Sequence, residues 1–554
     1  MDKEKKKLTI PSWNDISESE RPSSFKTKYE LRESYFEDWE STLRSHQFDC
    51  ILECIDPKIG QCFLPTATGK TWIQMWLHVE DMISKTKENK TGVYVIVAHR
   101  LTLCTQLLNT FYDLMCRCGL RFDPIYVGSE PYNFSKLQEK YRAFGSLNSG
   151  SEGEQTTNPD VIIKRVEAAQ SNNKHAFIVS TYHSLDKLKN LKRIDVCTFD
   201  EAHKTVPSAD FIENINTVKP IMDRQYFFTA TKVVRGEDGG QNDEKFYGPT
   251  LYALPTVEAL KMGEIVRPRI ITIQVKNDKE IDLGIIMKVN TVIEAFENHQ
   301  SQLRECSADR DKIGTKLLVS TNGLKELHLI CSDEKFKEWC RINGIRTFVY
   351  SSDEGNNGYY IDFKKHNKIK TLGAMVALKD TENAILIHHD ILTEGIDLPS
   401  ITGVLLLREL TSTKLYQTVG RATRLLKEDR LKIYSNEIKF VYNPGKENEP
   451  YNPDLKEINK MIKPCCHVML PYYVGTDFSK TGKLIEELQT SFGIPVSDIG
   501  EIEKRPPPPP PPPGRINDKS KSKDGKEYEL EFYLEGRRIE QMKHDLEKNP
   551  HKFF

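Results

Sequence analysis

The amino-acid sequence predicts an α/β fold with two tandem domains, each built around a parallel β-sheet. The first observation is a series of continuous apolar runs that end in polar residues, at 92–99, 175–183, 193–203 and 224–231. The second is a similar series at 315–321, 346–352, 383–389 and 402–410. Each run is typical of a buried parallel strand that delivers polar side chains at its carboxyl end, where open α/β sheets bind their ligands.

Length and composition exclude several classes of protein. The chain has 554 residues, of which 38% are hydrophobic, so more than one core can form. The 79 basic and 80 acidic side chains nearly cancel, so a nucleic-acid binder would need local basic grooves. No apolar run is long enough to span a membrane, and no apolar stretch follows the basic N-terminus as in a secretory signal. With 12 scattered cysteines, we expect an intracellular protein, cytoplasmic or nuclear and not secreted.

Composition also predicts where the domains begin and end. We expect a mobile leader over 1–34, a first domain over 35–262, a second over 263–445, an extension over 446–504 that packs on the second domain, and a disordered tail over 505–554. Segments 130–160 and 232–245 are polar and glycine-containing, which favours surface insertions or disordered loops. Eight consecutive prolines at 506–513 predict an extended spacer, with a polyproline-binding partner as the alternative.

The sequence LPTATGKT at 64–71 predicts a phosphate-binding loop between a strand and a helix. Backbone N–H groups and the helix dipole would hold the anion, Lys70 would reach the β- and γ-phosphates, and the Thr71 hydroxyl would coordinate Mg²⁺. The residues expected to bind the nucleotide here are Pro65, Thr66, Ala67, Thr68, Gly69, Lys70 and Thr71. Leu64 and Ala67 depart from the glycine pattern, and GKT also occurs in ordinary turns.

Two adjacent carboxylates, Asp200 and Glu201, follow the apolar run that ends at 199 and open the tetrapeptide DEAH. A metal-binding carboxylate is needed at this place if it is to meet a phosphate loop on a neighbouring strand. We expect Asp200 to hold Mg²⁺ and Glu201 to orient and deprotonate the attacking water. The alternative is an acidic surface turn at a helix start.

The order of motifs resembles that of superfamily 2 helicases and translocases of the DEAH-box type. The motifs are LRSHQ (43–47), VAHRLTLCTQ (97–106), VSTYHSL (179–185), FTAT (228–231), the segment 248–270, VSTNGLKEL (319–327), LTEGIDLPSI (392–401) and QTVGRATR (417–424). The resemblance implies two RecA-like domains that close over one ATP and Mg²⁺. It also implies that Gln47 reads adenine, that Gly395 and Asp397 bind the nucleotide, and that His203, Thr229 and Thr231 couple hydrolysis to the grip on nucleic acid.

The last motif has its own physical argument. Arg421 and Arg424 lie three residues apart, which would place both on one face of a helix. Two guanidinium groups there can grip a γ-phosphate as an arginine finger does. Gln417 and Gly420 complete the family pattern, which disfavours the alternative of an exposed basic helix face.

Nucleic-acid contacts are expected from polar residues after the strands, through backbone and hydroxyl donors to phosphates. The candidates are His99, Arg100, Thr181, Thr321 and Thr393. A threonine at a strand end is also a common helix cap, which is the alternative for these hydroxyls.

These observations predict a nucleic-acid-stimulated ATPase, a helicase or translocase that moves along or unwinds nucleic acid. The form of the motifs is similar to that of DNA-repair and restriction-type translocases and of helicases of large DNA viruses, which favours DNA. An RNA helicase is the alternative, and an ATP-binding scaffold that recruits partners through its polyproline tail is another. No nuclease constellation is apparent, so cleavage is not expected.

Overall fold

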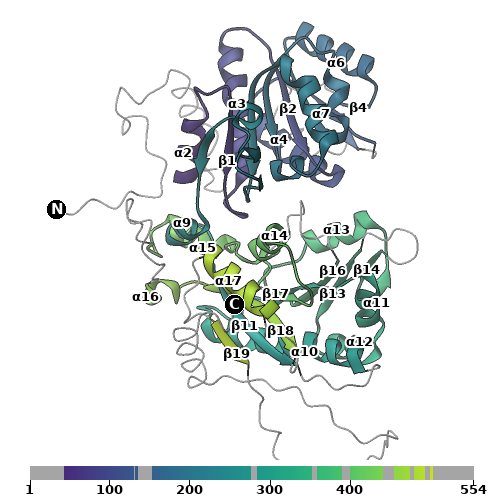
Figure 1. The fold of residues 1–554 in the computed structure, drawn as a ribbon, viewed down its shortest axis with the longest axis vertical. Helices are drawn as coiled ribbons and strands as arrows, with labels where there is room; N and C mark the ends of the chain where they lie inside the picture. The colour runs from purple at the N-terminus through teal and green to yellow at the C-terminus, as the bar shows by residue number, and fades with distance from the viewer. Residues whose placement is uncertain are drawn as a thin grey trace, which may run out of the picture. The chain divides into compact units, whose positions relative to one another are not determined.

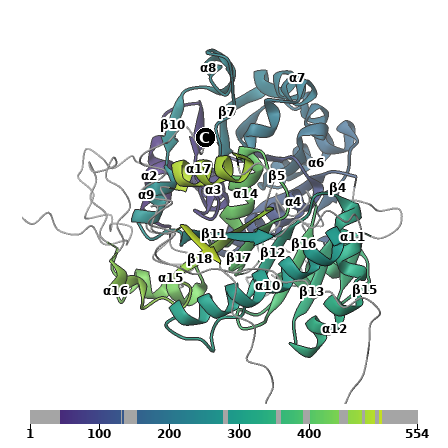
Figure 2. The same ribbon diagram turned by 60° about the horizontal axis from the view of Figure 1, so that its bottom comes forward.

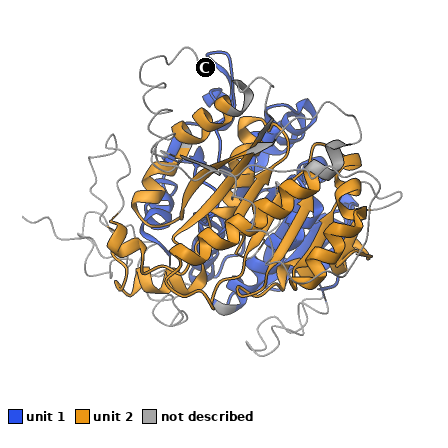
Figure 3. Cartoon of the chain, turned by 90° about the horizontal axis from the view of Figure 1, so that it is seen from below, with its two compact units in different colours: residues 1–255 blue, residues 256–554 orange. Residues whose placement is uncertain are grey.

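The computed structural model describes residues 43–129, 132–134, 153–275, 283–351, 358–389, 398, 400–440, 454–473, 479–492 and 499–502. The chain divides into two compact units, residues 1–255 and 256–554 (Figure 3). The boundary expected from the sequence lies slightly later, between 262 and 263. The expected leader, the polyproline segment and the tail lie outside the described residues.

The first unit is a parallel sheet covered by helices on both faces (Figure 1). Its strands are β1 (Ile59–Phe63), β2 (Val93–Ala98), β3 (Phe122–Val127), β4 (Glu154–Gln155), β5 (His175–Thr181), β6 (Ile194–Phe199), β7 (Met222–Thr229) and β10 (Thr250–Ala253). Their order in the sheet is β10-β1-β7-β6-β2-β5-β3-β4, and all described pairs are parallel. The helices are α2 (Ser45–Glu53), α3 (Lys70–Lys87), α4 (Leu101–Arg117), α6 (Pro159–Ser171), α7 (Ala209–Val218) and α8 (Glu244–Tyr247), with 3₁₀ turns η6 (Tyr182–Leu188), η7 (Ala202–Thr205) and η8 (Lys219–Ile221).

Side chains of β2 alternate between two cores, which explains why its apolar run is continuous. Tyr94 and Ile96 belong to the core that α2, α3 and α4 cover. Val95 and Val97 belong to the opposite core, which α6, η6 and α7 cover. A strand buried on both faces must be apolar at every position, and this pattern predicted the strand correctly.

The second unit is also an α/β unit with a mostly parallel sheet (Figure 2). Its strands are β11 (Arg267–Val275), β12 (Lys316–Ser320), β13 (Arg346–Tyr350), β14 (Tyr359–Ile361), β15 (Lys364–Lys365), β16 (Ala384–His388), β17 (Gly403–Leu406), β18 (Cys465–Tyr473) and β19 (Ile499–Ile502). Their order is β15-β14-β13-β16-β12-β17-β18-β11-β19, and the pairs of β14 with β13 and with β15 are antiparallel. The helices are α9 (Thr256–Lys261), α10 (Leu283–Cys306), α11 (Leu324–Ser332), α12 (Glu334–Ile342), α13 (Lys368–Val376), α14 (Ser412–Ala422), α15 (Lys427–Tyr434), α16 (Leu455–Ile458) and α17 (Ser479–Phe492).

The segment 446–504 contributes strands to this second sheet. β18 pairs with β17 on one side and with β11 on the other, and β19 pairs with the far side of β11. This segment was expected to be an extension that packs on the second domain, and it is instead part of that domain's sheet. The two parallel-sheet units themselves confirm the predicted fold class, that of tandem RecA-like domains.

The two segments expected to be surface insertions or disordered loops are 232–245 and 130–160. The segment 232–245 contains a small antiparallel pair, β8 (Val234–Arg235) with β9 (Gly239–Gly240), so it is an ordered surface hairpin rather than a disordered loop. The expected insertion at 130–160 lies partly outside the described residues, and α6 begins before its end, at Pro159. None of the described helices combines the length and the apolar character that crossing a membrane requires.

Candidate ATP-binding site

The loop after β1 has the backbone of a phosphate cradle. Gly69 has a φ of 82°, in the left-handed region, and it immediately precedes α3. Ala67 has a φ of 75°, so a non-glycine residue also adopts the left-handed conformation. The Thr68 hydroxyl donates to the carbonyl of Pro65 at 2.8 Å and closes the turn. Lys70 is the first residue of α3, and its Nζ donates to the Leu64 carbonyl at 3.3 Å.

Ala67→Gly is expected to stabilise the first unit, because glycine adopts a positive φ without the clash that a Cβ makes. We expect the free energy of unfolding to rise by about 1 kcal/mol, measured by urea denaturation. The matched control is Ala168→Gly at an exposed position of α6, where we expect a loss of about 0.5–1 kcal/mol. A loss at position 67 equal to that of the control would contradict the interpretation.

Helix α2 lies against this loop and explains the position of Gln47. The Gln47 side chain donates to the carbonyls of Thr68 at 3.0 Å and Gly69 at 3.3 Å. Its Oε1 accepts the N–H of Arg44 at 2.9 Å, and His46 Nε2 lies 2.8 Å from the Thr68 carbonyl. A Cβ added to Gly69 would stand 2.3 Å from Gln47 Nε2, so Gln47 would have to move, and the φ of 82° also favours glycine here. Gln47 is buried in this arrangement, so the structure shows it bracing the loop, and its role in reading adenine stays a prediction.

Asp200 and Glu201 lie at the carboxyl end of β6, beside this loop. The Gln74 side chain of α3 donates to Asp200 Oδ1 at 2.8 Å, which ties the strand end to the helix that Lys70 begins. Burial and the negative charge of Glu201 raise the pKa of Asp200 to about 6, while the positive charge of Lys70 opposes the rise. A divalent cation fits this place, since two adjacent carboxylates repel each other there and burial adds to the cost of their charge.

Glu201 is held in an unusual backbone conformation. Its φ is 49°, in the left-handed region, and η7 begins directly after it. Non-glycine residues rarely adopt this conformation, and such residues cluster at functional sites. Glu201 Oε2 lies 3.4 Å from His203 Nδ1, so the glutamate and the histidine of DEAH face one another.

The structure connects His203 to the strand end at Thr229. His203 is buried, and its Nδ1 lies 2.8 Å from the Thr229 hydroxyl. That hydroxyl also donates to the Thr231 carbonyl at 3.2 Å and lies 3.3 Å from the Thr231 backbone N–H. The residues expected to couple hydrolysis to nucleic acid therefore form one connected chain from Glu201 to Thr231, and the coupling itself stays a prediction.

Two of the residues expected to contact nucleic acid have hydroxyl groups that are hydrogen-bonded within the protein. Thr181 ends β5, and its hydroxyl accepts the N–H of Ser184 at 3.2 Å, which makes it the cap of η6. Thr321 is fully buried, and its hydroxyl donates to the carbonyls of Gly323 and His388, each at 3.2 Å. These two hydroxyls are thus already bonded to local partners, and the cap interpretation applies to Thr181. His99 and Arg100 follow β2, and His99 lies close enough to Asp200 to oppose, in part, the rise in the pKa of that carboxyl group.

The second unit carries the arginine motif on α14. Gln417 and Arg421 lie within the helix and are buried. The helix ends at Ala422, and Thr423 caps it, so Arg424 lies beyond the last turn. The expectation that both arginines lie on one helix therefore holds for Arg421 alone, because α14 ends before Arg424. Burial and the charge of Arg430 lower the pKa of Arg424 to about 10. Crowded positive charge of this kind suits an anionic ligand.

Three predicted residues of the second unit, Thr393, Gly395 and Asp397, lie outside the described residues. Two residues that were not predicted from the sequence also contact predicted motifs in the structure. Gln74 contacts Asp200, and its place one helical turn after Lys70 is the sequence pattern that could have identified it. Lys463 contacts the end of α14 from the segment that was expected to pack on the second domain.

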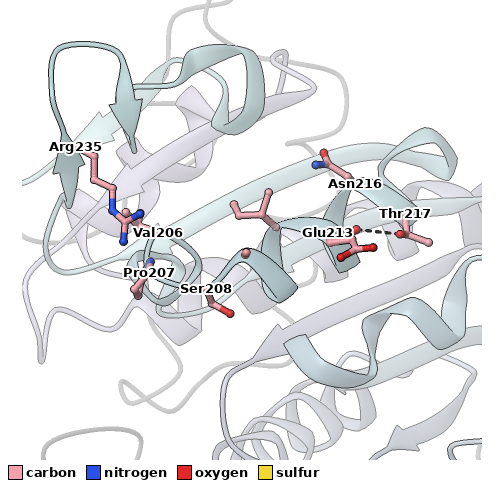
Figure 4. A pocket seen from close by; sticks show the side chains of 9 residues that line it. Val206, Pro207, Ser208, Glu213, Asn216, Thr217 and Arg235 are labelled. Carbon is pink, nitrogen blue, oxygen red and sulfur yellow. Dashed lines mark hydrogen bonds between the residues drawn. The ribbon is translucent and has the colours of Figure 1, made fainter.

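An open pocket lies between α7 and the β8–β9 hairpin in the first unit (Figure 4). Arg235 lines one side, and Val206, Pro207 and Ser208 line the start of α7. The Thr217 hydroxyl donates to the Glu213 carbonyl at 2.9 Å along the helix. None of the residues predicted to act on ATP or nucleic acid lines this pocket.

Comparison with known proteins agrees with the motif order. Residues 40–233 match the family model ResIII, described as the type III restriction enzyme, res subunit. No curated protein matches the chain in sequence. The fold resembles that of the ATP-dependent type ISP restriction-modification enzyme LlaBIII bound to DNA, with a TM-score of 0.52 and 14% identity, over 81% of this chain and 30% of that one. This chain therefore corresponds to about a third of the length of LlaBIII.

A second solved structure covers more of both chains. Mss116p bound to ssRNA and AMP-PNP gives a TM-score of 0.50 at 14% identity, over 91% of this chain and 81% of that one. At this identity both likenesses concern the fold. Together with the family-model match over residues 40–233, they confirm the resemblance of this chain to the superfamily 2 helicases and translocases.

Proposed function

We propose that this protein is an ATP-dependent translocase or helicase that acts on nucleic acid, with DNA favoured over RNA. The observation that carries the proposal is the meeting of Lys70, Asp200 and Glu201 at the carboxyl ends of the strands of the first sheet. The charge of Lys70 acts on Asp200, and Gln74 bonds the same carboxylate at 2.8 Å. A phosphate loop and an acidic pair so placed are what hydrolysis of a nucleoside triphosphate requires.

Each residue has a distinct task in this proposal. Backbone N–H groups of the loop and Lys70 bind the phosphates of ATP, and Glu201 orients and deprotonates the attacking water. When bound, Mg²⁺ neutralises charge on the phosphates, and Thr71 and Asp200 are the residues that would hold it. Arg421 and Arg424 stabilise the charge that develops on the γ-phosphate.

Support for DNA comes from the family model and from the motifs. The matched family is named for a restriction enzyme, and LlaBIII, whose fold is similar, was solved bound to DNA. The decisive experiment measures ATP turnover with single-stranded DNA, duplex DNA, RNA or no polymer. We expect the highest rate with one of the DNA substrates. A higher rate with RNA would establish the RNA alternative, and absence of turnover with every polymer would contradict the proposal.

Thr229→Val is expected to weaken the coupling between polymer binding and hydrolysis. The valine keeps the shape of the side chain but removes the hydroxyl that lies 2.8 Å from His203 Nδ1 and bonds to Thr231. A hydrogen bond contributes about 1 kcal/mol, so we expect stimulation by polymer to fall roughly fivefold while the basal rate stays within twofold. The matched control is Thr217→Val on α7, whose hydroxyl donates to a helical carbonyl. Full stimulation in Thr229→Val would show that coupling does not pass through this hydroxyl.

A further inference from the structure

Lys463 is a fully buried lysine whose ammonium bonds only to main-chain atoms among its described contacts. Its Nζ donates to the carbonyls of Ile401 at 2.7 Å, Ala422 at 2.7 Å and Arg424 at 2.6 Å. An ammonium has three N–H donors, so these three acceptors satisfy it completely.

The three carbonyls belong to two segments of the predicted motor. Ala422 is the last residue of α14, and Arg424 is the second residue after it. Ile401 ends the motif LTEGIDLPSI and precedes β17. Carbonyls at the end of a helix lack partners within it and carry the negative end of its dipole, so a cation there is favourable. Lys463 thus fixes the path of the backbone where it leaves the helix between Arg421 and Arg424.

The backbone of Lys463 is itself fixed. The Asp429 carboxylate on α15 accepts the N–H of Ile462 at 2.7 Å and that of Lys463 at 2.8 Å. Asp429 is fully buried as well. Lys463 thus links α15, through its backbone N–H, to the end of α14, through its ammonium, and both contacts are buried. A displaced Lys463 would leave the Asp429 carboxylate and three carbonyls without these donors.

Burial of this charge is unfavourable in itself. It lowers the pKa of Lys463 to about 8. An apolar side chain would fill the same space without that cost. It would, however, leave three carbonyls without their donor, so the ammonium both satisfies these carbonyls and fixes the geometry among them.

We propose that Lys463 is a positioning residue for the arginines of QTVGRATR, acting through the carbonyls of Ala422 and Arg424. This inference rests on the proposed function, since it requires that Arg421 and Arg424 act during ATP hydrolysis. Lys463 touches neither ATP nor water in this scheme. It fixes the backbone that carries the two guanidinium groups.

The test is Lys463→Met, which keeps the length of the side chain and removes its donors. We expect kcat for polymer-stimulated hydrolysis to fall by about tenfold to a hundredfold with KM for ATP unchanged, because small displacements of a positioned group slow chemistry without weakening ground-state binding. The matched control is Lys316→Met. Lys316 is also fully buried, its pKa is likewise lowered to about 8 by burial, and its Nζ donates to the carbonyl of Asp380 at 2.9 Å. We expect kcat of this control within twofold of wild type.

A double variant shows whether Lys463 acts through the arginines. Added to Arg424→Ala, Lys463→Met is expected to cost little further activity, because the group that it positions is already gone. If the losses of kcat in Lys463→Met and Arg424→Ala multiply in the double variant, the inference is overturned. Wild-type kcat in folded Lys463→Met would overturn it as well.

Two outcomes separate this inference from others. If Lys463→Met does not fold, as read by circular dichroism, Asp429→Asn replaces it with the same expected kcat-selective loss, and wild-type kcat there would overturn the inference. Absence of turnover in the wild-type chain overturns the proposed function and this inference with it, whereas turnover that depends on Arg424 and not on Lys463 overturns this inference alone.

Discussion

Glu201→Gln is expected to reduce ATP turnover by about two to four decades, the usual range for loss of a general base. The carboxamide keeps the shape of the side chain, so binding of ATP should persist while deprotonation of the water is lost. The left-handed backbone at Glu201, with a φ of 49°, holds this side chain facing His203. Turnover would be measured by phosphate release and binding by a fluorescent ATP analogue.

Two controls define this result. Glu213→Gln removes an exposed carboxylate on α7 in the same unit and should leave turnover unchanged. Lys70→Ala should instead weaken nucleotide binding, because its ammonium is expected to bind the phosphates directly. Near-normal turnover in Glu201→Gln would show that the base lies elsewhere.

Replacing Arg421 or Arg424 by alanine is expected to reduce hydrolysis by about three decades, the lower range for an arginine finger. The reduction should leave nucleotide affinity of the first unit unchanged, because both arginines belong to the second unit. Lysine should not restore the rate at either position, because an ammonium cannot make the planar, two-pronged contact of a guanidinium. Phosphate release and nucleotide affinity would be measured on each variant.

The structure makes this second prediction sharper than the sequence did. Arg421 lies within α14 and Arg424 lies beyond its end, so the two side chains leave the backbone from different local conformations. The two alanine variants should therefore differ in magnitude. Arg341→Ala on α12, where Arg341 is exposed and paired with Glu338, is the matched control. Full activity in the double variant Arg421→Lys and Arg424→Lys would remove the arginine-finger role from both residues.

The strands that the sequence predicted share one physical property. The eight apolar runs correspond to β2, β5, β6, β7, β12, β13, β16 and β17. The apolar residues of these runs are buried on both faces of the sheets, which is why an apolar composition indicates such strands. β11 was missed because polar residues such as Arg267, Arg269 and Thr272 interrupt its apolar pattern. β18 was missed because it lies in a segment that was expected to stand outside the sheet.

The motifs predicted the location of the site better than its detailed contacts. Lys70 and Asp200 meet because each follows the carboxyl end of a parallel strand in the same sheet, which the sequence does indicate. The expectation that the two strands are neighbours is wrong, because β7 lies between β1 and β6. The cap made by Thr181 was among the alternatives that its place at a strand end indicates, whereas the buried bonds of Thr321 depend on a local backbone turn that the sequence did not indicate. The three carbonyls around Lys463 come from distant positions, and only the tertiary fold brings them together.

The position of β18 has a consequence for how the chain acquires its structure during synthesis. β11 is the first strand of the second unit to be synthesised, yet its inner neighbour consists of residues 465–473, and its outer neighbour consists of residues 499–502. Until those residues appear, β11 and β17 expose backbone edges that can pair with other chains. The nascent second unit is thus open to aggregation for most of its translation, and a stop codon near 445 would leave that open sheet as the final product.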